Sequence, residues 1–372
     1  MMRVVIDYRP ALRQRSGVGE YTHELARALV ALGAEDRRPL DLTLFSSSWK
    51  DRASIEDGLR GATLVDRRVP VSLLNLAWHR FQWPSAETLA RGPFDITHSM
   101  HPLLMPAHRA AQVVTIHDLN FLSHPERTRA EIRRDYPTLA RRHAQQADAI
   151  IAVSQFTAGE VQRLFDIPAE RVAVCSPGAP PWTPRDGPPA TGYVLFFGTL
   201  EPRKNVGGLL DAYERLAGRR RLPPLVLAGQ ATEAARPWLE RIRRPPLERL
   251  VRHVGYVDPA RRRELYADAI CLVQPSFDEG FGITVLEAMT AGVPVVVTDR
   301  GALPEVAGAA GEVVSADDPD ELAAAVERLI DDPALAARRT ALGIARAREF
   351  RWDATARKVY DTYEYANRHR RA

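Results

Sequence analysis

Short apolar runs of strand length alternate with amphipathic stretches of helical length along most of the chain. Residues 3–7 form the first run, and its centre of Val4, Val5 and Ile6 is typical of strands in parallel sheets that are covered on both faces. A helical pattern follows and continues to about Leu32. Further strand-like runs in the first half cover residues 40–45, 94–97, 112–116, 149–153 and 172–175. Strands that alternate with helices at this spacing predict a parallel sheet with helices on both faces.

A proline-dense segment, residues 179–191, interrupts this alternation once. Proline fixes the backbone and removes a hydrogen-bond donor, so the segment is predicted to be a linker rather than a central strand or helix. The alternation then restarts, with strand-like runs at residues 193–197, 225–228, 251–254, 270–274, 295–298 and 312–314. The length of 372 residues also exceeds what one hydrophobic core usually covers. We therefore predict an α/β protein with two Rossmann-like domains, residues 1–178 and 192–350, that face each other across a cleft.

Composition argues against a nucleic-acid-binding protein and indicates where in the cell the protein is located. The net charge of +4 is small for this length, and the arginines that dominate it alternate with acidic residues along the predicted helices. This pattern does not favour a nucleic-acid partner, and the chain carries no recognisable helix-turn-helix or basic-aromatic platform. Cys175 and Cys271 lie inside apolar runs without metal-ligand spacing, which is typical of reduced core cysteines in a cytosolic protein. We expect a cytoplasmic location, because no signal peptide precedes the first strand and no apolar run reaches membrane-spanning length.

The most informative stretch covers residues 275–299, between two of the strand-like runs. A loop that carries Glu279 and Gly282 leads into a helix that is predicted to begin near Ile283 and that contains Glu287. Glycine lets a backbone approach a ligand closely, and the free amides of a helix start attract anions. Carboxylates are poor phosphate ligands but good acceptors for sugar hydroxyls. The stretch therefore predicts a pocket for a ligand that carries both phosphate and sugar.

A second loop, residues 198–205, follows the strand at residues 193–197 and places Arg203 beside Lys204. The planar fork of arginine and the point charge of lysine together suit a diphosphate. The carboxyl ends of parallel strands meet at one edge of a sheet, so this loop and residues 275–299 are expected to lie together. The alternative is a surface loop with solvated charges.

The motif Gly17-x-Gly19 follows the first strand and precedes a helix, as in dinucleotide-binding proteins. The loop is too long for that motif, and Thr22 stands at the position of the third glycine. No ribose-binding acid follows the next strand, at residues 40–45. An NAD-type enzyme is therefore disfavoured, and a flexible glycine loop that faces a ligand is the better interpretation.

Three histidines follow two predicted strands at their carboxyl ends, namely His98, His101 and His117. A histidine triple suggests a metal ion, but the spacing across two loops is unconvincing and no carboxylate completes a recognisable ligand set. We predict no metal site, and we interpret His117 as a polar contact in the cleft.

Residues 67–91 have an unusual composition. They include Leu73, Leu74, Leu76, Trp78, Phe81 and Trp83, with arginines at positions 67, 68 and 80. A core helix whose tryptophans pack against the sheet is the favoured interpretation. The alternative is an acceptor-docking surface or a peripheral contact of the first domain with the inner face of a membrane. Likewise, the arginine-rich residues 127–143 indicate either a solvated helix face or attraction to anionic lipid or a diphosphate-bearing acceptor.

With these residues assembled, the chain resembles the retaining glycosyltransferases of family 4, which have the two-domain GT-B fold. Glu279 and Glu287 match the family signature of two glutamates separated by seven residues, and the expected glycine and proline follow at residues 292–294. Further matches are Gly17-x-Gly19, residues 115–118, 153–157, 198–205 and 255–257, and Trp352. Residues 50–93 match loosely, which leaves the acceptor side undefined. Thr199 stands where many relatives carry an arginine, so phosphate contacts are expected from the two cations at the end of its loop.

The resemblance implies a division of labour among the site residues. Arg203 and Lys204 would hold the diphosphate of a sugar donor and stabilise the charge that builds on the leaving nucleotide. Glu279 would accept hydrogen bonds from the transferred sugar, and Glu287 from the ribose. His117 would contact the sugar near the reacting carbon. Further donor contacts are implied for Gly17, Gly19, Gly198, Tyr256, Val257, Phe281, Gly282, Ile283 and Thr284.

The resemblance also implies an activity. It is the transfer of a hexose, with retention of anomeric configuration, from a nucleotide-diphosphate sugar to a saccharide or lipid-linked saccharide in polysaccharide or glycolipid assembly. Residues 201–205 are similar to the loop of mannosyltransferases, so GDP-mannose is the first expected donor. No cofactor or metal is implied, because the protein cations replace a metal ion. The last helix, within residues 351–372, is expected to return to the first domain.

Two other functions stay open at this point. The first is a GT-B nucleotide-sugar epimerase, which needs no acceptor. The second is a catalytically silent nucleotide-sugar-binding partner protein. The complete set of Arg203, Lys204, Glu279, Glu287 and His117 argues against the second, since a silent relative would be free to lose some of them.

Overall fold

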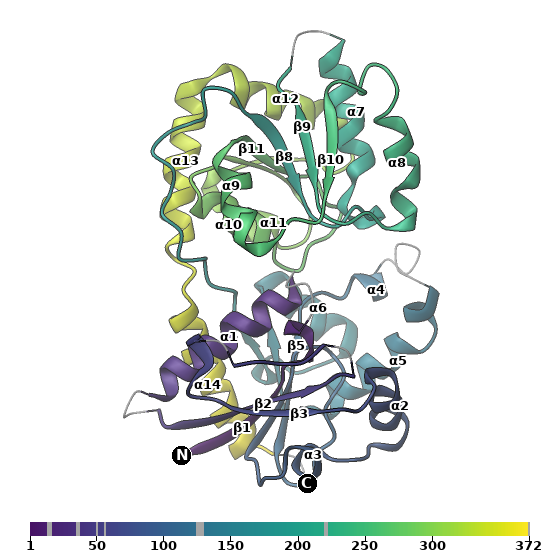
Figure 1. The fold of residues 1–372 in the computed structure, drawn as a ribbon, viewed down its shortest axis with the longest axis vertical. Coiled ribbons are helices and arrows are strands. Elements are labelled where there is room, and N and C mark those ends of the chain that lie inside the picture. Colours follow the sequence, from purple (N-terminus) through teal and green to yellow (C-terminus); the bar gives the residue numbers. More distant parts are fainter. Residues whose placement is uncertain are drawn as a thin grey trace. The chain divides into compact units, whose positions relative to one another are not determined.

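The computed structural model describes residues 1–12, 17–34, 38–49, 51–55, 57–123, 130–218 and 222–370. The chain divides into two compact units (Figure 1). Unit 1 comprises Met1–Gly178 and Arg351–Ala372, and unit 2 comprises Ala179–Phe350. Each unit is built on a parallel sheet with helices on both faces. This arrangement confirms the α/β class predicted from the alternation of apolar runs.

Unit 1 contains a seven-stranded sheet in the order β3-β2-β1-β4-β5-β6-β7. Its strands are β1 (Met2–Asp7), β2 (Leu40–Ser47), β3 (Thr63–Arg67), β4 (Ile96–Ser99), β5 (Ala111–Ile116), β6 (Ala149–Ala152) and β7 (Val172–Val174). The direction of strand addition reverses between β1 and β4, where the parallel register pairs Ile6 with His98. Paired residues of parallel strands point to the same side, so these two side chains share one face of the sheet.

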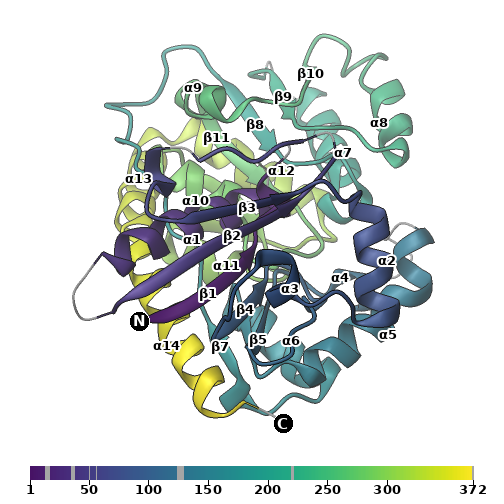
Figure 2. The ribbon, with the colours of Figure 1, turned by 60° about the horizontal axis from the view of Figure 1, so that its bottom comes forward.

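Helices from both ends of the chain cover that face of unit 1. α1 (Val18–Gly33) packs against α14 (Trp352–Arg368), and the hydroxyl of Tyr363 on α14 hydrogen-bonds His98 at 2.6 Å. Figure 2 shows α14, in yellow, alongside the strands of this sheet. The opposite face is covered by α2 (Val71–Phe81), α3 (Ala86–Ala90), α5 (Ala130–Gln146) and α6 (Gln155–Phe165), and the short α4 (Asn120–Ser123) contacts α5.

Unit 2 contains a six-stranded sheet in the order β10-β9-β8-β11-β12-β13. Its strands are β8 (Tyr193–Phe197), β9 (Leu225–Ala228), β10 (Val251–Gly255), β11 (Ala269–Gln274), β12 (Val295–Thr298) and β13 (Gly311–Val314). One face packs against α7 (Val206–Ala217) and α12 (Pro319–Asp331). The remaining helices are α8 (Arg236–Arg241), α9 (Arg262–Ala267), α10 (Ile283–Thr290), α11 (Leu303–Ala307) and α13 (Pro333–Ala347). The proline-dense residues 179–191 form no helix or strand and are tied to this unit by Arg185, whose Nε donates to the carbonyl of Gly292 at 3.1 Å.

Several boundaries follow from local chemistry. The Ser154 side chain accepts a hydrogen bond from the Thr157 amide and so begins α6 at the position predicted from sequence. Asn205 caps α7 in the same way, through the Gly208 amide at 3.2 Å. In contrast, β3, α11 and α13 were not predicted. The predicted strand at residues 94–97 lies two residues further along, as β4.

α2 divides the apolar side chains of residues 67–91 between the core and the surface. Leu74 and Trp78 are buried, and the Trp78 Nε1 donates to the carbonyl of Pro84 at 2.9 Å. The exposed side chains are Leu73 (56%), Leu76 (58%), Phe81 (69%) and Trp83 (65%). The core interpretation is therefore right for Trp78 and wrong for Trp83. Of the arginine-rich residues 127–143, those before residue 130 lie outside the described part of the chain.

Candidate donor site

The predicted loops of unit 2 lie at the point where the strand order of its sheet reverses. β8 and β11 are neighbours there, and each is followed by one of the two loops, residues 198–205 and 275–282. Open α/β sheets bind ligands outside the carboxyl ends of strands at such a switch point. The amide of Phe277 donates to the carbonyl of Arg203 at 2.9 Å, which ties the two loops together.

Glu279 is the centre of a buried polar network. Its side chain is 8% exposed and forms ion pairs with Lys204 and, at 3.2 Å, with Arg203. Ser276 Oγ and Gln274 Nε2 also donate to its Oε1, at 2.9 and 2.8 Å. Burial by itself raises the pKa of Glu279, but the charges of Lys204 and Arg203 and their hydrogen bonds outweigh it and lower the pKa to about 2. The carboxylate is therefore ionised at neutral pH and orients both cations.

Arg203 is held from a second side. Its Nη2 lies 2.9 Å from Glu201 Oε1, and its Nη1 donates to the carbonyl of Asp278 at 3.2 Å. Lys204 and Arg203 nevertheless keep 12% and 18% of their side-chain surface exposed. Both cations thus stand in a fixed arrangement that a small anion can reach.

The start of α10 provides the second feature of an anion site. Gly282 precedes the helix with φ of +96°, a backbone conformation that favours glycine. Within the described part of the chain, no side chain caps this helix start, so its first amides are available to a ligand. Thr284 Oγ1 donates to Gln274 Oε1 at 3.3 Å, which links the helix to the network around Glu279. The Phe281 ring turns inward instead and packs edge-on against Phe350 at 5.6 Å.

Glu287 occupies a separate environment on the same helix. Arg262 Nη1 lies 3.1 Å from its Oε1, and the Tyr266 hydroxyl donates to its Oε2 at 2.8 Å. The side chain is 6% exposed. The sequence interpretation gave the two glutamates different tasks, and the structure gives them different partners. Arg262 and Tyr266 were not predicted, because their relation to α10 comes from the packing of α9.

The other predicted donor-binding residues of unit 2 are distributed along the same sheet edge. Gly198 follows β8 and touches Gly229, where a Cβ would lie 2.0 Å from the Gly198 carbonyl oxygen. Tyr256 and Val257 follow β10, which β9 separates from β8. Tyr256 is 37% exposed beside Gly255, which has φ of +71°. Gly229 was missed from sequence, although its position directly after β9 is a usable signal.

In unit 1, His117 follows β5 as predicted. Its Nε2 donates to the carbonyl of Met100 at 3.2 Å, and the Tyr21 ring packs edge-on against it at 5.0 Å. Burial lowers the pKa of His117 to about 4, so the ring is neutral at pH 7. The other two histidines have hydrogen-bond or ion-pair partners of their own. His98 hydrogen-bonds Tyr363 and Thr115, and His101 lies against Asp7.

Gly17 and Gly19 of the first loop are glycines for different structural reasons. Gly17 has φ of +49°, and no atom of the described residues lies within 4 Å of where a Cβ would be. Gly19 lies inside α1, and a Cβ there would stand 2.7 Å from the carbonyl oxygen of Pro10. Gly19 is thus required by packing, whereas Gly17 leaves a surface that a ligand can approach. Residues 13–16 of this loop lie outside the described residues.

Within the described residues, no three histidine, cysteine, aspartate or glutamate side chains are arranged to hold a metal ion. None of the helices described is both long enough and apolar enough to cross a membrane.

Two Rossmann-like sheets, with cations and a helix start at the switch point of the second, define a glycosyltransferase of the GT-B type, and sequence comparison agrees. The model of the family described as "Glycosyltransferase Family 4" matches residues 15–181, and that described as "Glycosyl transferases group 1" matches residues 191–332. The O-antigen chain mannosyltransferase B of Escherichia coli is 30% identical over 386 aligned residues, which cover 98% of this chain and 100% of that protein. The chain belongs to glycosyltransferase family 4.

Solved structures show the same fold at low sequence identity. A sucrose-phosphate synthase from Thermosynechococcus elongatus aligns with a TM-score of 0.79 and 19% identity, covering 98% of both chains. The Anabaena protein HepE in complex with UDP and glucose aligns with a TM-score of 0.65 and 20% identity, covering 98% of this chain and 100% of that one. These likenesses support the GT-B fold.

Proposed function

We propose that the protein is a retaining hexosyltransferase that uses a nucleotide-diphosphate sugar, with mannose from GDP-mannose as the first candidate, and a saccharide or lipid-linked saccharide as acceptor. The observation that carries this proposal is the convergence of Arg203 and Lys204 on Glu279 beside the uncapped start of α10. An arrangement of fixed cations and free amides suits a diphosphate leaving group.

The chemistry follows from these groups. The bond between the anomeric carbon and the departing phosphate oxygen breaks while the acceptor hydroxyl oxygen attacks from the same side, and the acceptor proton passes to the phosphate oxygen. Arg203, Lys204 and the first amides of α10 stabilise the charge on that oxygen. Preorganised contacts of this kind contribute about 3–4 kcal/mol each. The two protein cations take the place of a metal ion in this proposal.

The two glutamates are proposed to read different parts of the donor. Glu279 accepts hydrogen bonds from hydroxyls of the transferred sugar and keeps the cations in place. Glu287, fixed by Arg262 and Tyr266, accepts hydrogen bonds from the ribose. Substitution with glutamine tests this division, because it keeps the shape of the side chain. Glu287→Gln is expected to weaken the binding of GDP and of GDP-mannose equally. Glu279→Gln should lower turnover and should weaken the binding of GDP-mannose more than that of GDP.

The choice of mannose rests on the relative from Escherichia coli, which is an O-antigen chain mannosyltransferase. HepE, which has the same fold, was solved with UDP and glucose, so the base and the sugar both need a direct test. The purified protein is incubated with UDP-, GDP- and ADP-sugars, and the released nucleotide is measured with and without a panel of glycoside acceptors. Acceptor-dependent release from GDP-mannose, with an α-linked product by NMR, is expected. Conversion of the donor without acceptor would indicate an epimerase, and binding without turnover would indicate a silent partner.

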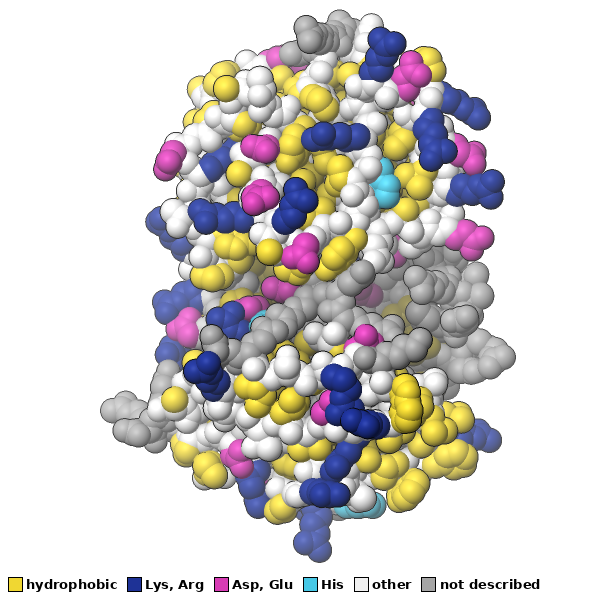
Figure 3. Space-filling view, in the orientation of Figure 1, with side chains coloured by type: hydrophobic (Ala, Val, Ile, Leu, Met, Phe, Trp, Pro, Cys, Tyr) yellow, Lys and Arg dark blue, Asp and Glu magenta, His cyan; other side chains and the backbone are white. Residues whose placement is uncertain are grey.

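The exposed side of α2 supports a peripheral membrane contact as part of the same function. Hydrophobic side chains gather over α2 in Figure 3, with basic side chains nearby. The exposed apolar residues are Leu73, Leu76, Phe81 and Trp83, and α2 itself contains no acidic residue. The exposed Arg142 of α5 lies close, since its Nη2 donates to the carbonyl of His79 at 3.5 Å. An apolar face beside cations fits a lipid surface with anionic headgroups.

Co-sedimentation with vesicles tests this contact. Binding is expected to vesicles that contain phosphatidylglycerol, and to be weaker with phosphatidylcholine alone or at high salt. Trp83→Ala combined with Leu76→Asn should abolish it. Trp78→Phe serves as the control, because Trp78 is 1% exposed. If the wild type and the double variant bind vesicles equally, the proposed membrane contact of α2 is wrong.

A further inference from the structure

Residues 182–185 of the proline-dense linker are fastened to two short helices of the donor site. The Nη1 of Arg185 donates to the carbonyl of Ala267, the last residue of α9, at 3.2 Å. The Nε and the backbone amide of the same residue donate to the carbonyls of Gly292 and Ala291 after the end of α10, both at 3.1 Å. One residue of the linker thus holds the carboxyl ends of both helices.

Both helices depend on such contacts because they are short. α9 has six residues and α10 has eight, and isolated helices of this length are unstable in water. The last carbonyls of a helix have no partner within it and carry partial negative charge, which a guanidinium satisfies. The linker also lies directly against Gly292, where a Cβ would stand 3.5 Å from the side chains of Pro184 and Arg185. The position of α9 relative to α10 therefore depends on the linker.

Trp182 of the linker contacts one of the two residues that orient Glu287. Its ring centre lies 5.8 Å from that of Tyr266, which is fully buried. The Tyr266 hydroxyl lies 2.8 Å from Glu287 Oε2 and 3.2 Å from the carbonyl of Thr284, so its single proton is directed to the carboxylate. The linker ring thus packs on the residue that holds one oxygen of Glu287.

The other oxygen of Glu287 is held from the first turn of α9. Arg262 Nη1 lies 3.1 Å from its Oε1, and both side chains are buried. The next residue, Arg263, donates from its Nη2 to the carbonyl of Thr183 in the linker at 3.3 Å. The linker therefore contacts α9 at both ends, and α9 supplies partners for both oxygens of Glu287.

We propose that residues 182–185 are positioning residues for Glu287 and thereby set the affinity for the ribose of the nucleotide. This inference rests on the proposed function, in which Glu287 accepts hydrogen bonds from the ribose. A carboxylate can accept both ribose hydroxyls only in one orientation, so loss of the linker contacts removes the ribose-dependent part of the affinity. The part that comes from the diphosphate depends on Arg203 and Lys204 and is unchanged.

Titration calorimetry with GDP and 2′,3′-dideoxy-GDP separates these two parts. Wild type is expected to bind GDP about tenfold more tightly, because the dideoxy nucleotide offers Glu287 no hydroxyl. Trp182→Ala and Arg185→Met should each reduce this ratio to about twofold and leave the affinity for the dideoxy nucleotide nearly unchanged. Trp182→Phe keeps a ring against Tyr266 and should retain most of the ratio. Arg241→Met is the matched control, since Arg241 ties α8 to α7 in the same unit and should keep the wild-type ratio.

UDP and ADP are measured with their dideoxy forms in the same way, and the variants are tested with the base that wild type binds most tightly. An unchanged ratio in both variants, or an equal loss of affinity for both nucleotides, would overturn the proposal. Should Arg185→Met fail to fold, Trp182→Ala decides, because that side chain is partly exposed.

Kinetics give a second reading of the same variants. Trp182→Ala is expected to raise the donor KM about fivefold with kcat nearly unchanged, because it weakens binding of the ground state and of the transition state alike. A lowered kcat at an unchanged donor KM would contradict the role of the linker. Absence of turnover with every donor would contradict the proposed transfer and leave the nucleotide ratio standing, whereas no binding of any nucleoside diphosphate by wild type would overturn both proposals.

Discussion

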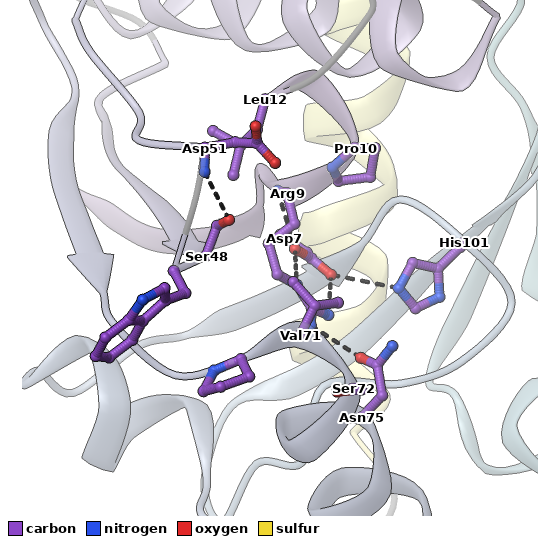
Figure 4. A pocket seen from close by; sticks show the side chains of 12 residues that line it. Asp7, Arg9, Pro10, Leu12, Ser48, Asp51, Val71, Ser72, Asn75 and His101 are labelled. Atoms are coloured by element: carbon purple, nitrogen blue, oxygen red, sulfur yellow. Dashed lines mark hydrogen bonds and ion pairs between the residues drawn. The ribbon is translucent and has the colours of Figure 1, made fainter.

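In each unit the strand order reverses once, between β1 and β4 in unit 1 and between β8 and β11 in unit 2, and charged side chains follow at both reversals. In unit 1, the Arg9 side chain is 8% exposed, forms an ion pair with Asp7 (Figure 4) and stacks on the Trp78 ring. In unit 2, the cations stand on a loop beside a helix start and stay partly exposed. Topology therefore determines where each charged cluster lies, and the exposure of its cations determines whether an anion can reach them.

Removal of a unit 2 cation should have the largest effect on activity. Lys204→Ala is expected to lower kcat about 100- to 1,000-fold, because it removes a preorganised contact to the leaving group. The released nucleotide gives the rate. Arg236→Ala is the matched control, since Arg236 is an exposed cation of the same unit with an 82% exposed side chain. A loss of less than about fivefold in Lys204→Ala would remove this residue from the proposed chemistry.

The ion pair of unit 1 should instead be structural. Arg9→Met leaves the buried Asp7 carboxylate with His101 alone beside it and is expected to lower the free energy of unfolding by about 3–5 kcal/mol. Asp7→Asn combined with Arg9→Met should recover part of this loss. Urea unfolding measures both, and the donor KM of the folded variants should match wild type. A changed donor KM with unchanged stability would reverse the roles assigned to the two units.

Acid should destabilise unit 1 before unit 2. Burial lowers the pKa values of His117 and His143 to about 4 and that of His98 to about 3, from 6.5. Each histidine takes up a proton on unfolding below pH 6.5, so stability falls from pH 6.5 towards pH 4, on the order of 3 kcal/mol for His117.

The corresponding group in unit 2 behaves differently. The lowered pKa of Glu279 contributes stability that is present above pH 4.5 and is lost as the pH falls towards 2. Hydrogen exchange at pH 7 and pH 5, corrected for intrinsic rates, should therefore show lost protection first in peptides of unit 1. Earlier loss in unit 2 would contradict the charge states assigned to these groups.

The smallest expected effect concerns His117. His117→Asn should lower turnover about tenfold, which corresponds to one hydrogen bond to the transferred sugar. The lowered pKa keeps His117 neutral above about pH 4. The pH profiles of kcat/KM for the wild type and for His117→Asn should therefore have the same shape near pH 6.5. His108→Asn, an exposed histidine of the same unit, is the control. A variant with full activity would leave His117 as a packing residue against Tyr21.

Much of the fold could be predicted from sequence because it depends on local chemistry. The strands β8, β9 and β12 begin and end where their apolar runs do, and α6 begins after its capping residue Ser154. β3 was missed because it is an edge strand with the half-polar sequence TLVDR, which lacks a continuous apolar run. Trp83 was assigned to the core as part of the expected helix, but α2 ends at Phe81 and Trp83 follows it on the surface.

For the site, the residues that carry charge were recognisable, and the residues that orient them were not. Arg203, Lys204 and Glu279 belong to a spaced motif, and the structure brings all three together. Gln274 and Ser276 complete the network around Glu279, but one ends a buried strand and the other begins a loop, where their types are ordinary. The assigned roles of these residues in catalysis stay predictions.

The sequence by itself determined the α/β class, the family and the donor-side motif, because each is encoded in the order and spacing of neighbouring residues. Tertiary structure decided the rest. It gave Glu279 two cations and Glu287 an arginine and a tyrosine, and it joined Asp7, Arg9 and His101 in one ionic cluster. Those partners are distant in sequence, and burial and mutual distance, which set their charge and accessibility, exist only once the chain is folded.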